Sequence, residues 1–288
     1  MKKSKLAKVL TVSLAALMVF GLASCGGGSG KVSDKDITVI SREEGSGTRD
    51  AFTELTGVLQ DDVDKTVDTA EISNSTSVVT QSVAGNDAAI GYISLGSLDD
   101  TVKAVKVDGV EATVDNIKSG DYKIQRPFNI VTRGEVKELP ADFIKFIMSK
   151  DGQKIIEDEG YISVNDNAEA YKASGLKGSI TLAGSTSVSP VMEVLADKYK
   201  ELNSGVTIEI QQTGSGAGIQ STTEGVCDIG MASRELKDEE TSQGLKSEEI
   251  ALDGIAVIVN KDNGVEDLSM DQIMKIFTGE ITNWADVK

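Results

Sequence analysis

The sequence of 288 residues contains no histidine, and its only cysteines are Cys25 and Cys227. Ser-His-Asp and Cys-His catalysis need an imidazole base, and most zinc sites use imidazole as a ligand. No motif indicates a carboxylate or lysine tuned to move protons at neutral pH. We therefore expect that the protein is not an enzyme and that it has no catalytic residue, no metal and no cofactor. We also expect Cys227 to be a buried apolar residue without a disulfide partner.

The N-terminal segment differs in composition from the rest of the chain. Four lysines precede an apolar run at 9–22 and two small residues, which is typical of a secretory signal segment. A retained membrane helix is the alternative, but the run is short for a bilayer and lacks a charged stop. The letters LASC at 22–25 also resemble a bacterial lipobox, in which Cys25 carries the lipid. We predict a lipoprotein signal peptide at 1–24 and a flexible, glycine-rich tether at 25–33.

Basic side chains are scarce, with 29 Lys and Arg against 46 Asp and Glu, and the formal charge is −17. Removal of residues 1–24 takes away four lysines and gives −21. Nucleic-acid backbones bind basic surfaces, so we expect no nucleic-acid partner. Any anionic ligand must be held by a local group of donors.

Apolar runs of strand length alternate with segments of helical periodicity, which predicts an α/β fold. The expected helices cover 191–202 and 141–158, the second starting after Pro140. A polar stretch at 165–178 reads as a linker. The expected strands cover residues 37–40, 88–93, 128–132, 180–183, 206–211, 228–231 and 255–260.

Three glycine-containing turns stand between a predicted strand and the start of a predicted helix. They read SREEGSGTRDAF at 41–52, GSTSVSP at 184–190 and TGSGAG at 213–218. Backbone N–H groups at a helix start attract anions, glycine permits close approach, and hydroxyls add further donors. Each turn alone could be an ordinary helix cap. Three together predict an anion-binding site.

Two arginines are the candidate charge partners of that anion. Arg42 begins the first turn, and Arg234 follows Ser233 after the predicted strand at 228–231. The planar fork of an arginine suits tetrahedral oxyanions, although either side chain could instead pair with neighbouring glutamates at the surface. Nucleotide sites are poorly supported, because neither a full G-x-G-x-x-G nor a P-loop spacing occurs.

Five segments together resemble the phosphate-binding lipoproteins of bacterial ABC phosphate importers, and the resemblance covers nearly all of the mature chain. It implies a two-lobed, periplasmic-binding-protein-like (type II) α/β fold with hinge strands that closes on phosphate. It also implies delivery to permease subunits with their ATPase, and a lipid-anchored monomer on the outer face of the cytoplasmic membrane. The segments are 41–52, ITLAGSTSVSP at 180–190, QTGSGAGIQ at 212–220, DIGMASR at 228–234 and FTGEITNW at 277–284.

The order of these segments differs from that of the family, whose first half resembles residues 178–288 here. The sequence is therefore predicted to be circularly permuted, with the chain ends side by side and the linker joining the old termini. A gene-model error that joins two halves is the alternative. The predicted lobes are 34–124 plus 254–288 (lobe II) and 125–253 (lobe I), with crossing strands at 123–132 and 255–260.

The resemblance also implies the site residues. Many family members carry an aspartate after the Ala-Ser of the DIGMASR motif, where it favours phosphate over sulfate; Arg234 stands there, which weakens that selectivity argument. We expect Arg234 to serve as a second arginine for the dianion. The implied contacts are Thr186, Ser187, Ser215, Arg42, Ser46, Gly47 and Thr48.

Three other functions remain open from the sequence. The chain could be a receptor for another oxyanion, such as sulfate, molybdate or tungstate. It could be a secreted hydrolase with Ser46 or Ser185 as nucleophile, which the lack of histidine disfavours. It could also be a surface adhesion or signalling module that uses the fold without the ligand.

Overall fold

Helices and strands alternate along the computed structural model, which describes residues 34–287. The predicted signal peptide at 1–24 and the whole predicted tether at 25–33, with Cys25, lie outside the described residues. The helices are α1 Gly47–Thr56, α2 Thr76–Ala84, α3 Val114–Lys118, α4 Glu138–Ile147, α5 Lys150–Asp158, α6 Ser189–Leu202, α7 Ser215–Glu224, α8 Asp238–Thr241 and α9 Met270–Phe277. The strands are β1 Thr38–Arg42, β2 Leu59–Gln60, β3 Val63–Asp64, β4 Glu71–Ser73, β5 Ala89–Ser94, β6 Val102–Ala104, β7 Lys106–Val107, β8 Gln125–Arg133, β9 Ile162–Ser163, β10 Gly178–Gly184, β11 Val206–Gln212, β12 Ile229–Ala232, β13 Leu245–Asn260 and β14 Asp267–Leu268.

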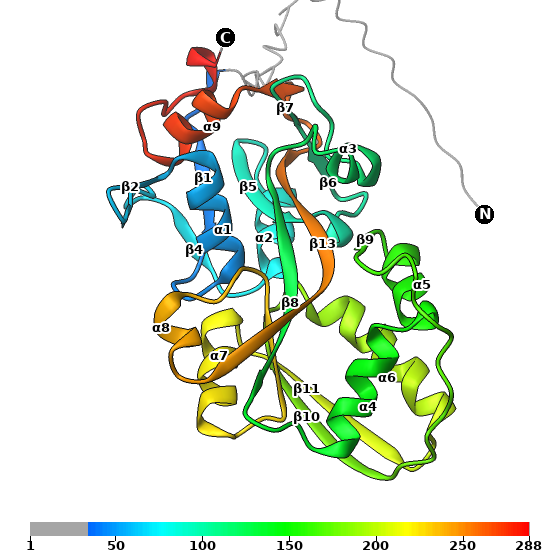
Figure 1. The fold of residues 1–288 in the computed structure, drawn as a ribbon. Helices are drawn as coiled ribbons and strands as arrows, with labels where there is room; N and C mark the ends of the chain where they lie inside the picture. Colours follow the sequence, from blue (N-terminus) through cyan, green and yellow to red (C-terminus); the bar gives the residue numbers. More distant parts are fainter. Residues whose placement is uncertain (1–33, 288) are drawn as a thin grey trace, which may run out of the picture. The chain divides into compact units, whose positions relative to one another are not determined.

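One ten-stranded sheet contains most of the strands, with the order β11-β10-β12-β8-β13-β5-β1-β4 and with β6 and β9 added on β13. The strands β11, β10 and β12 are parallel to one another, and so are β5, β1 and β4. Between these groups, β8 and β13 run antiparallel to their neighbours. Figure 1 shows them as the two long strands that connect the two groups of elements.

The strand β13 belongs to both groups. Its first part, from Leu245 to Gly254, pairs with β8, and from Ile255 onward it pairs with β5. The sequence predicted only its second part, because the stretch 246–249 is polar and exposed and therefore lacks the apolar pattern of a buried strand. The structure thus begins this strand ten residues earlier than predicted.

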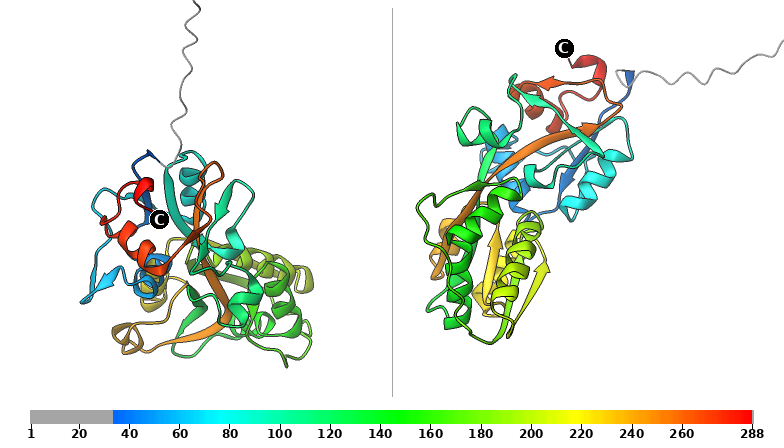
Figure 2. Two further views of the ribbon diagram at one scale, coloured as in Figure 1. Left: turned by 90° about the horizontal axis from the view of Figure 1, so that it is seen from above. Right: turned by 90° about the vertical axis from the view of Figure 1, so that its right-hand side faces the viewer.

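Two main hydrophobic cores lie on either side of this crossing. The first core includes Phe52 and Tyr92, whose rings stack with centroids 3.9 Å apart, together with the end of α9. The second core includes Phe128 and Tyr199, with α4, α5 and α6 packed against β10 and β12. We call the part around the first core, with β1, β4, β5, α1, α2 and α9, the first-core half. The part around the second core, with β10, β11, β12 and α4 to α7, is the second-core half. Figure 2 shows the same division from two further directions.

The single helix predicted at 141–158 is wrong, since the structure has two helices, α4 and α5, at this place. Ser149 begins α5 as its N-cap, and its hydroxyl accepts a hydrogen bond from the amide of Gly152. A Cβ on Gly152 would lie 2.3 Å from the carbonyl oxygen of Phe146, so the second helix packs directly on the end of the first. The apolar stripe runs through both helices and hides the break from a periodicity argument.

The two ends of the described chain lie side by side, as the sequence predicted. Asp36 and Asn283 form an antiparallel bridge, and the amide of Trp284 donates to the carbonyl oxygen of Lys35 at 3.0 Å. The indole of Trp284 is buried and donates to the carbonyl oxygen of Ala88. The first and last described residues therefore lie together in the first-core half.

The polar linker has no helix or strand until β10 begins, again as predicted. The Asp142 carboxylate on α4 holds it, accepting hydrogen bonds from Tyr171 at 2.5 Å, Ser174 at 2.8 Å and Tyr199 of α6 at 2.7 Å. The side-chain oxygen of Asn203 accepts from the amides of residues 174 and 175. The linker is thus attached to the second-core half by specific polar contacts.

Candidate anion-binding site

Arg42 is the buried cation at the end of β1, with only 2% of its surface exposed. Its Nη2 donates to the hydroxyl of Thr186 at 3.1 Å, and its Nη1 donates to the hydroxyl of Thr76 at 3.4 Å. On its other side, Nε and Nη2 donate to the two carboxylate oxygens of Glu43, each at 2.8 Å. The guanidinium therefore reaches from the first-core half to Thr186 in the second-core half.

Hydroxyl groups from both halves gather beside this guanidinium. The Ser187 hydroxyl lies 2.9 Å from that of Thr48 and 3.1 Å from that of Thr76. A further pair, Ser215 and Ser233, has its two hydroxyls 3.3 Å apart. We call the following six residues the hydroxyl cluster: Thr48, Thr76, Thr186, Ser187, Ser215 and Ser233.

Gly47 lies beside this cluster at a place where the two halves approach each other closely. A Cβ on Gly47 would lie 2.5 Å from the hydroxyl oxygen of Ser215 and 2.7 Å from that of Ser233. Beside it, the amide of Gly216 donates to the carbonyl oxygen of Gly45 at 2.9 Å. A side chain at position 47 would therefore displace the hydroxyls of Ser215 and Ser233 from their present positions.

The cluster lies at the N-terminal ends of four helices. Thr48 and Ser215 are in the first turns of α1 and α7, Thr76 begins α2, and Ser187 is in the turn before α6. Helix N-termini carry partial positive charge and unpaired amide donors, so they favour an anion, as the guanidinium of Arg42 does. This arrangement can bind a small oxyanion without any chemical reaction of the ligand.

Tyr92 fixes the end of β1 that carries Arg42. Its hydroxyl lies 2.8 Å from that of Ser41 and accepts a hydrogen bond from the backbone amide of Arg42 at 3.2 Å. Burial raises the pKa of Tyr92 to about 12, against the opposing effects of these hydrogen bonds and of nearby arginines. The phenol is therefore neutral near pH 7 and serves as a fixed hydrogen-bonding group.

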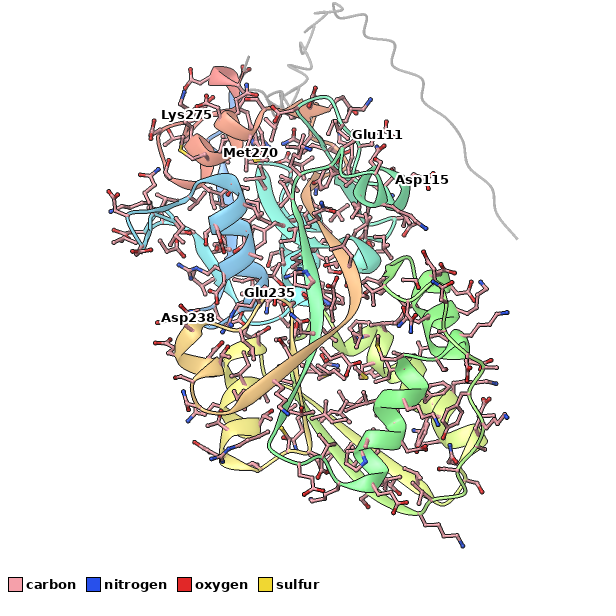
Figure 3. All side chains as sticks on the ribbon, in the orientation of Figure 1. Glu111, Asp115, Glu235, Asp238, Met270 and Lys275 are labelled. Atoms are coloured by element: carbon pink, nitrogen blue, oxygen red, sulfur yellow. The ribbon has the colours of Figure 1, made fainter. Side chains whose placement is uncertain are left out.

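Arg234 does not join the hydroxyl cluster, in contrast to its predicted role. Its Nε donates to Asp50 of α1 at 2.9 Å, and its Nη1 and Nη2 donate to the two carboxylate oxygens of Glu240 at 2.8 Å. Burial disfavours the charged guanidinium, but the carboxylates of Glu240 and Asp50 outweigh this and raise the pKa of Arg234. In Figure 3 the labelled Glu235 marks this segment near α1.

Most of the predicted site residues are nevertheless brought together. Arg42, Gly47, Thr48, Thr186, Ser187 and Ser215 meet in the cluster or contact it, while Ser46 caps α1 by accepting from the amide of residue 49. Sequence reasoning missed Thr76 and left Ser233 out of the contacts. Thr76 follows the short strand β4, and Ser75, the N-cap of α2, was the available signal.

A cavity of about 490 Å³, lined mostly by residues with polar side chains, adjoins the cluster through Thr76 and Thr186. Hydroxyl and amide side chains from both halves line it, among them Ser97 and Gln212, and Asp99 is the one ionisable residue in the lining. Among residues 34–287, no group of three or more Asp, Glu or Cys is placed to hold a metal ion. In the same range, no helix is both long enough and apolar enough to span a bilayer.

The fold and this inter-half site are those of a binding protein. Residues 28–151 and 169–288 match the family model described as a PBP superfamily domain, and the chain belongs to that superfamily. It is 52% identical over 294 residues to "Phosphate-binding protein PstS 2" of Streptococcus agalactiae serotype V, which covers 100% of this chain and 99% of that protein. The protein of the same name from Streptococcus pneumoniae serotype 4 is 47% identical, with 99% and 100% covered. The chain therefore belongs to the PstS-type family.

A solved structure supports this membership. The crystal structure of a phosphate-binding protein of a phosphate ABC transporter from Streptococcus pneumoniae TIGR4 has a TM-score of 0.72 and 49% identity, covering 88% of this chain and 100% of that chain. "Phosphate-binding protein PstS" of Bacillus subtilis is 38% identical over 127 residues only, which is 43% of this chain and 42% of that protein.

Proposed function

We propose that the protein binds inorganic phosphate at the hydroxyl cluster and delivers it to the permease subunits of an ABC importer, which work with their ATPase. The observation that carries this proposal is the buried guanidinium of Arg42 among hydroxyls and helix N-termini from both halves. Charge-assisted hydrogen bonds to a phosphate oxygen are among the stronger polar contacts in proteins. The names of the full-length relatives support phosphate as the ligand.

The proposed ligand contacts follow from these positions. Arg42 supplies the charge, and the other contacts supply hydroxyl or amide donors. Arg234 is left out because its donors serve Asp50, Glu240 and the carbonyl oxygen of Glu235, whereas Arg42 also donates to Thr76 and Thr186 of the cluster. The other proposed contacts are Ser46, Gly47, Thr48, Thr186, Ser187 and Ser215, to which we add Thr76 and Ser233.

We infer that residues 34–124 plus 254–288 form one lobe and residues 125–253 the other. Their separate hydrophobic cores and the change of pairing partner of β13 at Gly254 support this division. Because β8 and β13 connect the lobes, opening for ligand entry is a hinge motion about these strands. The contacts of Arg42 and Thr48 across the cleft would then form on closure.

We also propose that the chain is a circular permutant of other family members. The adjacent chain ends and the structured linker support this, as both are what a permutation needs. The match to the Bacillus subtilis relative supports it as well, since a collinear comparison of permuted chains can include only one half. The streptococcal relatives align over their full length and thus share this order, which argues against an error of joining.

The protein is further proposed to act as a lipid-anchored monomer on the outer face of the cytoplasmic membrane. The lipobox-like sequence ending at Cys25 and the glycine-rich tether behind it support this location. Phosphate would be captured outside the membrane and passed to the permease there.

Isothermal titration calorimetry with phosphate and sulfate tests the assignment of the ligand. We expect phosphate to bind with the lower Kd, and Arg42→Ala to remove most of the heat. Tighter binding of sulfate would end the phosphate assignment in favour of another oxyanion receptor. At 100 times the Kd, phosphate should also stabilise the fold by about 2.7 kcal/mol, and unchanged thermal stability would favour a module that does not use the ligand.

A hydrolase is not supported by the surroundings of the two candidate nucleophiles. The Ser46 hydroxyl accepts from the amide of Arg49, and the Ser185 hydroxyl accepts from the amides of Ser187 and Val188. Among the described residues neither serine is hydrogen-bonded to a side-chain base that could activate it. Hydrolysis of a phosphate ester that disappears in Ser46→Ala would contradict this reading.

A further inference from the structure

A fully buried ion pair joins the two crossing strands. Arg126 of β8 and Asp253 of β13 face each other in the strand register, and their side chains are 2% and 1% exposed. Both Nε and Nη2 of Arg126 donate to Oδ2 of Asp253, at 3.1 and 3.0 Å. The other carboxylate oxygen accepts from the hydroxyl of Ser94 of β5 at 2.8 Å. The guanidinium is therefore held in one orientation.

The remaining nitrogen of Arg126 points to the anion site. Its Nη1 donates to the backbone carbonyl oxygen of Ser233 at 3.3 Å, and the amide of Ser233 donates to the hydroxyl of Ser215 at 3.1 Å. The next carbonyl, that of Arg234, accepts from the side chain of Asn129, which is also on β8. Both backbone polar groups of Ser233 are thus fixed, the carbonyl by a crossing strand and the amide by the cluster.

Such a pair is costly to bury, and stability alone does not account for it. Removing two charges from water often costs more than their attraction returns, and an apolar pair of similar volume is often as stable. Burial raises the pKa of Asp253 to about 6, although Arg126 and Ser94 both favour its charged form. A planar guanidinium has several donors in a fixed geometry. Some of its nitrogens can therefore bind a carboxylate while another nitrogen donates to a different acceptor and fixes the position of that acceptor.

We propose that Arg126 is a positioning residue for anion binding, which acts through the carbonyl of Ser233 and is oriented by Asp253. This inference rests on the proposed function and adds to it a group outside the hydroxyl cluster. By fixing the backbone of Ser233, Arg126 places the Ser233 hydroxyl beside Ser215 and Gly47, where a phosphate oxygen would accept from it. Because Arg126 belongs to a crossing strand, the same contact ties this part of the site to the hinge.

A double-mutant cycle on the full-length protein tests this inference. Arg126→Lys keeps the positive charge beside Asp253, but a single ammonium group lacks the fork that serves Asp253 and Ser233 together. We expect it to weaken phosphate binding about fivefold to tenfold, as the loss of one hydrogen bond would. In a Ser233→Ala background the same substitution should change the Kd by less than about twofold, because its target hydroxyl is gone.

The matched control is Arg133→Lys, the same change on an exposed residue of the same strand, which should leave the Kd within about twofold. Equal losses for Arg126→Lys with and without Ser233→Ala would overturn the inference, and so would an unchanged Kd. If Arg126→Lys does not unfold cooperatively, the neutral pair Arg126→Gln with Asp253→Asn replaces it in the cycle, with the same expected result. If the unmodified protein does not bind phosphate, the proposed function fails first.

Discussion

At the scale of single residues, the charge of Arg42 and the neutral hydroxyls contribute differently to anion binding. The hydroxyls of Thr48 and Ser187 already bond to each other at 2.9 Å, so an anion that accepts from them replaces one neutral hydrogen bond by another. The gain from such an exchange is small. The Arg42 guanidinium is buried and charged, so its contact with an anion is charge-assisted and unscreened by water.

We therefore predict that Arg42→Ala weakens phosphate binding more than Ser215→Ala does. Loss of the charge-assisted contact should cost about 1.5 to 3 kcal/mol, against about 1 kcal/mol for the neutral hydroxyl. Calorimetric titration of both variants measures the difference, with exposed Arg133→Ala as the control for loss of a positive charge elsewhere. Equal losses would place Arg42 outside the binding pocket.

Gly47→Ala should act as a steric wedge between the halves. The added methyl group would lie 2.5 Å from the hydroxyl oxygen of Ser215 and 2.7 Å from that of Ser233, both in the second-core half. Overpacking of this kind costs about 1 to 3 kcal/mol, so we expect the Kd for phosphate to be weaker by at least about fivefold. Gly264→Ala adds the same methyl group where nothing lies within 4 Å and should bind normally. Normal binding by Gly47→Ala would contradict the close approach.

The pairing of residues across the site was only partly predictable from the sequence. The three glycine turns predicted an anion site with Arg42 as a charge partner, because each turn joins a strand to a helix start, and the family resemblance added Thr186 and Ser215 as contacts. Ser233 and Arg234 are adjacent, and at the end of β12 one faces the cluster while the other faces α1 and α8. The charge of Arg234 makes it the expected anion partner from the sequence. Only the path of the backbone shows that Ser233, and not Arg234, faces the cluster.

At the scale of elements, the linker between α5 and β10 shows how a polar segment can be ordered without a hydrophobic face. Asp142 accepts from three hydroxyl groups, two of them on the linker. Burial alone would raise the pKa of Asp142, but these hydrogen bonds from Tyr171, Tyr199 and Ser174 prevail and lower the pKa. The carboxylate form is therefore favoured in the folded protein.

Asp142→Asn should accordingly lower the free energy of unfolding at pH 7 by about 1 to 2 kcal/mol. Because the folded pKa is depressed, this stabilisation is complete above the unfolded pKa of about 3.9 and is lost as the pH falls through the lower folded value. Urea unfolding between pH 7 and pH 3 should show the two proteins converging at low pH. Asp158→Asn, at an exposed ion pair, is the control and should have little effect. A difference that is independent of pH would contradict the role of the charge.

Element types were more predictable than element limits. The alternation of strands and helices was confirmed, whereas the helix at 141–158 divides in two and β13 extends to Leu245. In both cases the deciding contact lies outside the apolar pattern: Ser149 caps α5 and Gly152 packs on the carbonyl oxygen of Phe146, and the polar part of β13 pairs with β8. Apolar periodicity contains neither kind of information.

At the scale of the whole molecule, the chain ends and the linker lie on different halves. The ends meet through Asp36 and Asn283 in the first-core half, and the linker is bound by Asp142 in the second-core half. The chain could therefore begin and end either at the junction of residues 36 and 283 or in the linker, and no buried strand or helix would be interrupted.

A rearranged chain tests the proposed permutation. It would start at residue 178, join residue 287 to residue 34, and end at residue 164. We expect it to fold and to bind phosphate within about threefold of the original Kd, because every contact of the site is retained. Titration and thermal unfolding of both chains measure this. A chain that does not fold, or that binds more than about tenfold more weakly, would contradict the equivalence of the two orders.

The strand β13 contributes its first ten residues to one sheet region and its last six to another, as one unbroken segment. Neither core can release this strand without removing a central member of the other. Unfolding of one half therefore exposes the core of the other half to water. The two halves should unfold together in one cooperative transition, even though they can rotate against each other while folded.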